Sequence, residues 1–162
     1  MVGRVQGVLL AGPDPVPLGT AAFALCSTSR RYVRWAALST GDSEGTERTT
    51  ERHLAELRSW AQVLVEHRRD GAAVVFDHER LRRIRDVGRV PVAVTDEPRV
   101  VDALLGEAPD WFAVFAAPSA PRRPWARLAD RFAVVVRLDR VSPVSVAHLV
   151  HHAAETHEGT AH

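Results

Sequence analysis

The sequence contains no lysine, so all 21 of its cationic side chains are arginines. A phosphate-binding loop with the pattern Gly-x-x-x-x-Gly-Lys-Ser/Thr needs its lysine on the phosphates, and an enzyme that works through a Schiff base needs an amine side chain. Both kinds of catalytic site are therefore excluded. Asparagine is also absent, and isoleucine occurs once, at Ile84.

Cysteine is nearly absent as well. Cys26, in the apolar stretch AAFALC, is the one thiol, so the chain can build neither an internal disulfide nor a zinc site of several cysteines. No apolar run reaches membrane-spanning length, and the run near the N-terminus is too short for a secretory signal. We therefore expect a cytoplasmic protein without membrane contact. The formal net charge of +1 favours neither a nucleic-acid partner nor an acidic substrate.

The 162 residues, 46% of them hydrophobic, are enough for one compact domain with a core. We expect a single domain over residues 1–155 and a flexible tail over 156–162. Apolar runs and alternating patterns predict strands at 4–12, 20–28, 30–40, 72–76, 90–94, 111–117 and 131–138. Apolar residues at helical spacing predict helices at 51–68, 79–88, 98–108 and 142–155.

The first part of this order carries a family resemblance. Three strands are followed by a helix with Arg-x-x-x-Glu-Leu and by a strand that ends in aspartate, in the segments GTAAFALCSTSRRYVRWAALSTG, ERHLAELRSWAQVL and AAVVFDHERLRRI. This arrangement resembles the front half of the ribonuclease H-like family. The resemblance implies an α/β fold with a mixed five-stranded sheet flanked by helices, in which the second strand runs antiparallel to the first and third. A fully parallel sheet would exclude it.

The same resemblance implies a metal site. In that family, carboxylates hold two divalent metals that cleave a phosphodiester, since hard cations require several oxygen ligands. It implies that Glu56 on the helix and Asp77 at the strand end are catalytic and bind Mg²⁺ or Mn²⁺. The chain departs from the family at both ends. The first strand has Leu10, Ala11 or Gly12 where the family has an aspartate, and Ala147 replaces an aspartate in the last helix. Three further residues are candidate ligands: Asp14, Asp139 and His148.

A cluster of arginines follows Asp77. Leu81 and Ile84 face inward at i, i+3 on the predicted helix 79–88, which leaves five cations on or beside its exposed side: Arg80, Arg82, Arg83, Arg85 and Arg89. Such a surface binds phosphates with release of counterions. It predicts contact with RNA or an RNA–DNA hybrid. The alternative is a solvated helix face in a chain whose only cation is arginine.

Three functions are consistent with these features of the sequence. The first is metal-dependent hydrolysis of RNA in an RNA–DNA hybrid, or of a related nucleic acid, as the ribonuclease H-like resemblance implies. The second is a degenerate ribonuclease H-like module that binds nucleic acid or a protein without cleavage, which the missing acids at both ends favour. The third is an α/β domain unrelated to that family, which binds a small molecule or a protein. The sequence does not set the oligomeric state.

Overall fold

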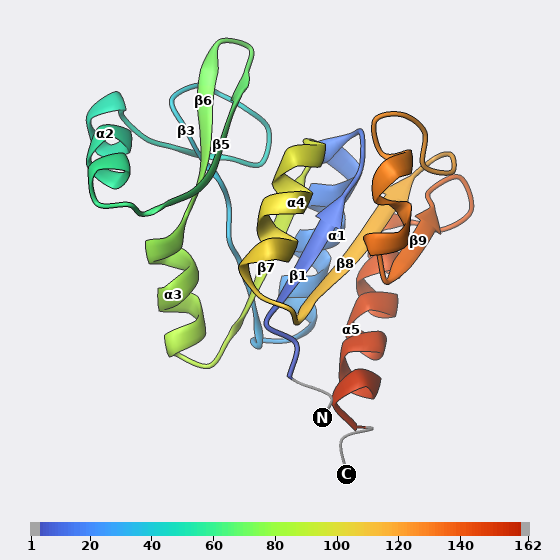
Figure 1. The fold of residues 1–162 in the computed structure, drawn as a ribbon. Helices are drawn as coiled ribbons and strands as arrows, with labels where there is room; N and C mark the ends of the chain where they lie inside the picture. The colour runs from blue at the N-terminus through green and yellow to red at the C-terminus, as the bar shows by residue number, and fades with distance from the viewer. Residues whose placement is uncertain (1–3, 160–162) are drawn as a thin grey trace.

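The computed structural model describes residues 4–159, which form two β-sheets (Figure 1). The larger sheet has five strands in the order β2-β7-β1-β8-β9. Its strands are β1 (Gly7–Ala11), β2 (Tyr32–Arg34), β7 (Val90–Thr95), β8 (Trp111–Ala117) and β9 (Val134–Arg137). Every neighbouring pair in this sheet is parallel. The predicted α/β class and five-stranded sheet flanked by helices are confirmed, whereas the mixed, ribonuclease H-like form of that sheet is wrong.

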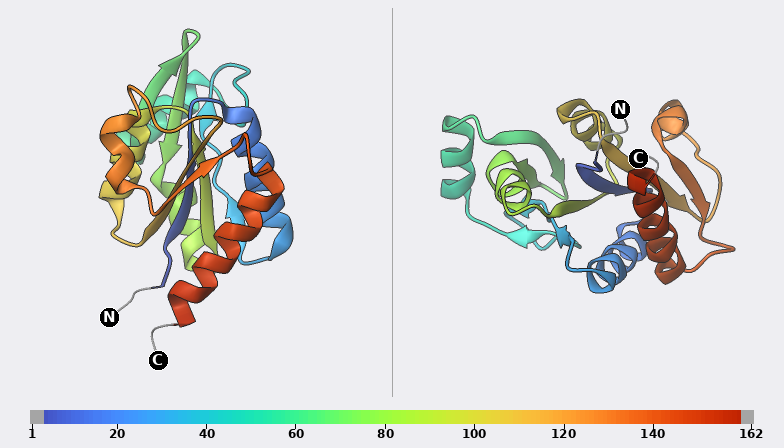
Figure 2. Two further views of the ribbon diagram at one scale, coloured as in Figure 1. Left: turned by 90° about the vertical axis from the view of Figure 1, so that its right-hand side faces the viewer. Right: turned by 90° about the horizontal axis from the view of Figure 1, so that it is seen from below.

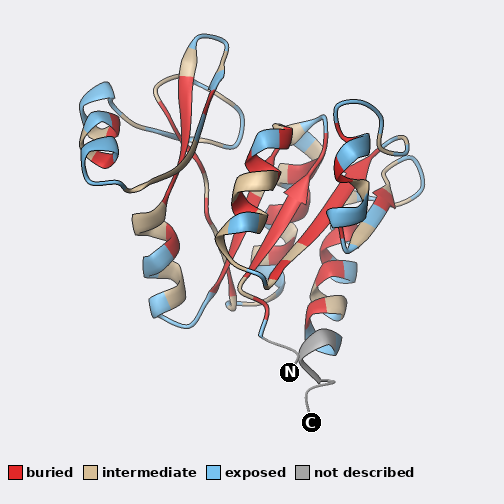
Figure 3. Ribbon diagram, in the orientation of Figure 1, coloured by how far each residue is buried: buried red, intermediate tan, exposed pale blue. Residues whose placement is uncertain are grey.

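Helices cover both faces of the parallel sheet (Figure 2). One face carries α1 (Pro15–Thr28) and α5 (Pro143–Gly159), and the other carries α4 (Pro98–Glu107) and the short 3₁₀ helix η1 (Ala126–Arg131). Successive residues of β1 alternate between two cores, with Val8 facing α1 and Leu9 facing α4. Strands buried on both faces must be apolar throughout, which explains the runs GVLLA and WFAVFAA (Figure 3).

The smaller sheet is inserted between β2 and β7 and has the strand order β4-β3-β6-β5. Its strands are β3 (Leu38–Ser39), β4 (Glu47–Arg48), β5 (Val63–Arg69) and β6 (Ala72–Asp77). Helix α2 (Glu51–Ser59) packs Leu54 and Leu57 against this sheet, and α3 (His78–Asp86) leads back to β7. β5 and β6 form an antiparallel hairpin around Asp70 and Gly71, whose φ angles of +50° and +80° are those of a two-residue hairpin turn.

The predicted strand at 20–28 is wrong, because these residues belong to helix α1. The helix begins at Pro15, and its N-cap is Asp14. Ala21, Ala22 and Leu25 are buried against the sheet, while Phe23 on the outer side is exposed. Because Phe23 on the exposed side of the helix is also apolar, the apolar residues show no helical spacing, and the sequence pattern is that of a continuous buried strand.

The predicted helix at 51–68 is correct only in its first half. It ends at Ser59, Ala61 adopts φ +53°, and Gln62 donates its backbone N–H to the carbonyl of Leu57 at 2.9 Å. The chain then reverses into β5. At the other end of the molecule, α5 continues to Gly159, into the segment predicted as a tail, and residues 160–162 lie outside the described part. No helix within residues 4–159 is long and apolar enough to cross a membrane. The cytoplasmic location stays a prediction.

Candidate functional site

The candidate site lies where the carboxyl ends of the parallel strands meet the smaller sheet. β2 and β7 lie on one side of β1, and β8 and β9 lie on the other, so the strand order reverses at β1. In open α/β sheets, ligands bind in the crevice outside the carboxyl ends of the strands at such a reversal. Three connections meet there: the loop after β1, the segment after β2 and the loop after β7.

The loop after β1 places the negatively charged side chain of Asp14 at the start of α1. The Asp14 carboxylate accepts a hydrogen bond from the backbone N–H of Val16 at 3.0 Å. A helix N-terminus attracts anions through its free N–H groups and its dipole. Three residues around this position have no N–H to offer: Pro13, Pro15 and Pro17. The place where a phosphate would bind is therefore occupied by a side-chain carboxylate and is poor in donors.

The same loop stands where a phosphate-binding loop would connect a strand to a helix. Counted from Gly12, that pattern requires glycine, lysine and a hydroxyl residue in succession, and the chain has Pro17, Leu18 and Gly19 there. Leu18 is buried in the core. Gly12 is required for another reason, since a Cβ on it would lie 2.2 Å from the carbonyl oxygen of Ala116. The loop thus connects a strand to a helix, as a phosphate-binding loop does, but lacks the residues of that loop.

Arg34, the last residue of β2, brings a cation to the site. Its Nη2 donates to the carbonyl of Gly45 at 3.3 Å, and its Nη1 is buried without a hydrogen-bond partner in the protein. Burial lowers the pKa of the guanidinium from its usual value, and the nearby Cys26 opposes this shift. An arginine side chain nevertheless stays charged at neutral pH. Among the side chains that the structure describes, residues 4–156, no carboxylate forms an ion pair with Arg34, so its charge is available to a ligand.

His67 on β5 is the second polar side chain held at the junction. It is 7% exposed, and its Nδ1 has no hydrogen-bond partner in the protein. Burial lowers the pKa of His67, and the charge of Glu97 offsets part of that effect. The imidazole is therefore neutral at pH 7 and can accept or donate a hydrogen bond. Beside it, Arg69 and Asp96 form an ion pair that ties the smaller sheet to the loop after β7.

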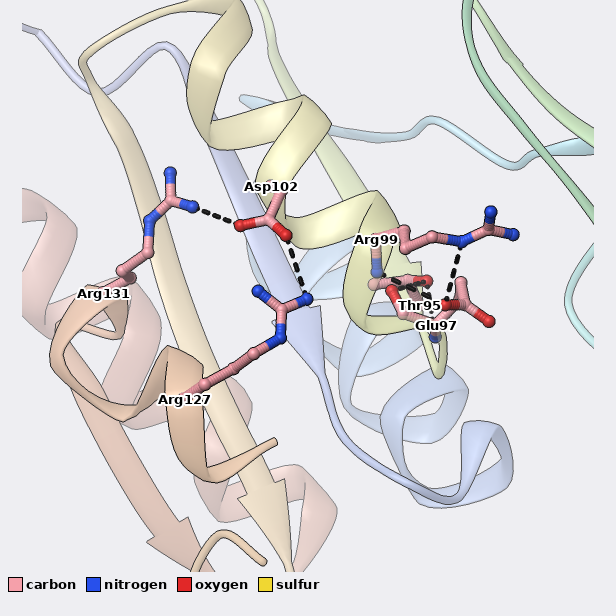
Figure 4. A network of polar contacts seen from close by, with 6 residues as sticks. All are labelled: Thr95, Glu97, Arg99, Asp102, Arg127 and Arg131. Carbon is pink, nitrogen blue, oxygen red and sulfur yellow. Dashed lines mark hydrogen bonds and ion pairs between the residues drawn. The ribbon is translucent and has the colours of Figure 1, made fainter. Parts of the chain in front are cut away.

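The loop after β7 is held by its own polar contacts (Figure 4). The Thr95 hydroxyl accepts from the backbone N–H of Glu97 at 3.0 Å, and the Glu97 carboxylate caps α4. Further along α4, Asp102 accepts hydrogen bonds from two arginines of η1: Arg127 at 3.0 Å and Arg131 at 2.5 Å. These contacts fix the carboxyl edge of β7 before any ligand binds.

Two cavities adjoin Arg34. The smaller, of about 30 Å³, lies between the sheets beside His67 and Thr95 and is large enough for a water molecule. The larger, of about 470 Å³, runs along the outer side of α1. Both cavities share three residues in their walls: Arg34, Glu44 and Gly45. Arg34 thus lies between a small cavity of mixed polar and apolar lining and a large, mostly apolar one.

Glu56 and Asp77, the two predicted catalytic carboxylates, have ordinary structural roles. Glu56 is partly exposed on α2, where it pairs with Arg52 at 3.6 Å. Asp77 is buried at the end of β6 and caps α3, because its Oδ2 accepts from the backbone N–H of Arg80 at 3.0 Å. Its Oδ1 is buried without a hydrogen-bond partner. Neither residue lines the two cavities beside Arg34.

The other candidate metal ligands lie on separate elements. Asp14 caps α1, Asp139 follows β9 and pairs with Arg137 at 2.9 Å, and His148 is exposed on α5. In the described part of the chain, no group of three or more histidine, cysteine, aspartate or glutamate side chains could hold a metal ion. The structure therefore does not assemble the predicted ligands of Mg²⁺ or Mn²⁺ into one site.

Four of the five predicted nucleic-acid-binding arginines make contacts within the protein. Arg80 pairs with Glu47 at 2.7 Å, Arg82 donates to Gln62 at 2.8 Å, and Arg83 pairs with Glu79. Arg85 binds both carboxylate oxygens of Glu107, at 2.5 and 3.0 Å, and stacks over Trp111. The fifth, Arg89, is exposed. The contacts of Arg80, Arg82 and Arg85 connect α3 to its neighbours, and that of Arg83 lies within α3. A nucleic-acid partner stays an untested prediction.

Sequence reasoning missed Arg34 and His67. The strand predicted at 30–40 contained Arg34, and nothing in that pattern marked its charge as unpaired. His67 fell in the wrong half of the predicted helix. Read as a strand, Val65, His67 and Arg69 point to one side and Glu66 and Arg68 to the other, which would have marked His67 as inward-facing.

No protein-family model and no curated protein matches the chain. Among solved structures, it is similar to guanylate kinase from Anaplasma phagocytophilum, with a TM-score of 0.68 and 11% sequence identity over 96% of this chain and 88% of that one. The likeness is one of fold. At this identity it transfers no residue roles, but it corrects the ribonuclease H-like interpretation together with the nuclease and non-cleaving functions drawn from it.

Proposed function

We propose that this protein binds a small anionic ligand at the junction of its two sheets and does not transfer phosphoryl groups. The observation that carries the proposal is Arg34. Arg34 lines both cavities at the carboxyl edge, and its guanidinium has no carboxylate partner among the described side chains of residues 4–156. A cation left unpaired in a partly buried site is stabilised when a ligand anion binds it.

The loop after β1 argues against phosphoryl transfer. Catalysis of that reaction depends on cations and backbone donors placed around the transferred phosphate. This chain has no lysine, its prolines remove donors, and Asp14 would place a like charge beside an incoming phosphate. The fold likeness to a guanylate kinase nevertheless makes guanylate a reasonable first anion to test.

Calorimetric titration tests the proposal. Wild-type protein would be titrated with guanosine monophosphate, ATP, inorganic phosphate and a set of organic carboxylates. We expect at least one anion to bind, and Arg34→Gln to weaken that binding roughly 10- to 100-fold, the range for losing charged hydrogen bonds. Arg52→Gln, at a position whose side chain is 91% exposed, is the matched control and should bind like wild type. Equal binding by Arg34→Gln, or no binding of any anion, would refute the proposal.

Guanylate kinase activity is the second candidate function, and the fold likeness favours it. A coupled assay with guanosine monophosphate, ATP and Mg²⁺ measures it directly. We expect no turnover above the background without protein, because the loop after β1 lacks the required groups. Turnover that survives purification to homogeneity would overturn the second half of the proposal.

A further inference from the structure

The larger cavity is a groove beside α1, and this groove is apolar along most of its length. Its wall on the helix side is formed by Val16, Gly19, Ala22, Phe23 and Cys26. The side chains of Val16 and Phe23 are 57% and 76% exposed, although apolar side chains of this size are usually buried. A ligand in the groove would cover both and remove their apolar surface from water.

Few polar groups of this wall are free to bind a ligand. Thr20 already donates its hydroxyl to the carbonyl of Val16 at 3.2 Å. Burial raises the pKa of the Cys26 thiol, so at neutral pH it adds no negative charge to the wall. The two charged groups of the lining are Arg34, which is partly buried, and Glu44, which is exposed to solvent. The groove thus presents an apolar surface and one partly buried cation, with the exposed Glu44 carboxylate as its other charge.

This combination selects a class of ligand. A nucleotide would bring a sugar and a base with several donors and acceptors, and most of them would find no partner on the helix wall, which costs free energy. A molecule with a single acid group and an apolar body matches both features. A volume of about 470 Å³ lies within the range of small-molecule sites.

We propose that the groove beside α1 binds a monocarboxylic acid with an apolar body, with the acid group on Arg34 and the body along Gly19, Ala22 and Phe23. This inference rests on the proposed function, because both use Arg34 as the anion contact. It goes further in naming the chemical class of the ligand and the wall that holds its apolar part.

Straight-chain carboxylates are the probes. Hexanoate, octanoate and decanoate would be titrated by calorimetry below the concentrations at which they form micelles. Each added methylene should tighten binding about fourfold until the groove is filled. Octylammonium and octan-1-ol, which lack the negative charge, should bind roughly 10- to 100-fold more weakly than octanoate. Equal binding of octanoate and octylammonium would overturn the role of Arg34.

A groove-filling variant locates the apolar body. A Cβ at Gly19 in α1 meets no atom within 4 Å, and the same holds at Gly106 in α4, which does not line the cavity. Gly19→Leu should therefore fold and weaken octanoate binding at least tenfold, whereas Gly106→Leu should bind it like wild type. Unchanged octanoate binding by Gly19→Leu would overturn the placement.

The two proposals fail in different ways. If guanosine monophosphate or phosphate binds through Arg34 and the carboxylates do not, the named ligand class is wrong and the proposed function stands. If no anion of either class binds to wild type, both are wrong. Octanoate binding that Arg34→Gln leaves unchanged would refute the placement of its acid group on Arg34, and it would refute the proposed function as well if no other anion binds through Arg34.

Discussion

Glu107→Gln should destabilise the fold by about 2–4 kcal/mol, because it removes the charge from an ion pair that is largely shielded from water. The side chains of Arg85 and Glu107 are 21% and 16% exposed. Glu107 accepts two hydrogen bonds from Arg85 and a third from Trp111 Nε1 at 2.9 Å, while Arg85 also donates to the carbonyl of Gln6 at 3.1 Å. The variant keeps the shape of the side chain and leaves the Arg85 charge without its counter-ion. Partial exposure places the expected loss below the full cost of breaking a buried pair.

Urea unfolding measures this loss. A change of 2–4 kcal/mol corresponds to a fall in melting temperature of roughly 4–16 °C for a chain of this size. Glu79→Gln is the matched control, because its partner Arg83 is also on α3 but is 69% exposed. We expect the control to lose about 0.5 kcal/mol or less. A Glu107→Gln variant within that range would refute the view that Arg85 serves the fold.

The same pair predicts the acid dependence of stability. Burial by itself raises the pKa of Glu107, but the hydrogen bonds from Arg85 and Trp111 outweigh it, so the pKa is lowered overall. A carboxyl group whose pKa is lowered in the folded state stabilises fully above its unfolded pKa of about 4.3 and loses that contribution as pH falls through the folded value. Wild type should therefore lose more stability than Glu107→Gln below about pH 4.3. Parallel unfolding curves for the two proteins across that range would contradict the assignment.

Three further predictions concern the candidate site, each measured by urea unfolding. Asp14→Ala should cost about 1 kcal/mol by removing the cap of α1, whereas Asp14→Ser should be close to wild type. Gly12→Ala should cost about 1–3 kcal/mol, because its Cβ would lie 2.2 Å from a backbone oxygen, while Gly106→Ala should stabilise by about 0.5–1 kcal/mol. Because burial lowers the pKa of His67 in the folded protein, the unfolded state binds the proton more readily. The free energy of unfolding should therefore fall as pH drops below about 6.5. In His67→Gln this dependence on pH should be weaker. If the free energy of unfolding depends on pH in His67→Gln as it does in wild type, another group is responsible for that dependence.

The central strands and the helices between them could be predicted because each has a distinct pattern. β6, β7 and β8 are apolar runs of strand length, since strands covered on both faces alternate between two apolar cores. Helix α4 has a proline in its first turn and one apolar face, with Val100, Val101 and Leu104 buried. In these segments the local pattern and the tertiary environment agree.

The strand directions could not be predicted, and the error had a specific cause. Reading 20–28 as a strand created a hairpin, and the hairpin implied an antiparallel sheet. With α1 in its place, β1 and the later strands are joined by helical crossovers, which produce a parallel sheet. The smaller sheet escaped detection because β3 and β4 have two residues each, too short for any periodic signal. The unpaired charge of Arg34 became recognisable only when this sheet was placed beside the larger one, whereas His67 was missed because β5 was assigned to a helix.

The loop after β1 connects the composition of the chain to its proposed function. The absence of lysine excludes a phosphate-binding loop, and the structure shows what stands there: a carboxylate cap, three prolines and a buried leucine. No single substitution would turn this loop into a phosphate-binding loop. Leu18→Lys would bury a charge in the core, Asp14 would still repel the phosphate, and Pro17 would still lack its N–H. The features that exclude a phosphate-binding loop are thus distributed over several residues, of which Asp14 caps α1 and Leu18 packs in the core. The free charge of Arg34 has no such structural explanation, and this difference is why the search for a ligand begins there.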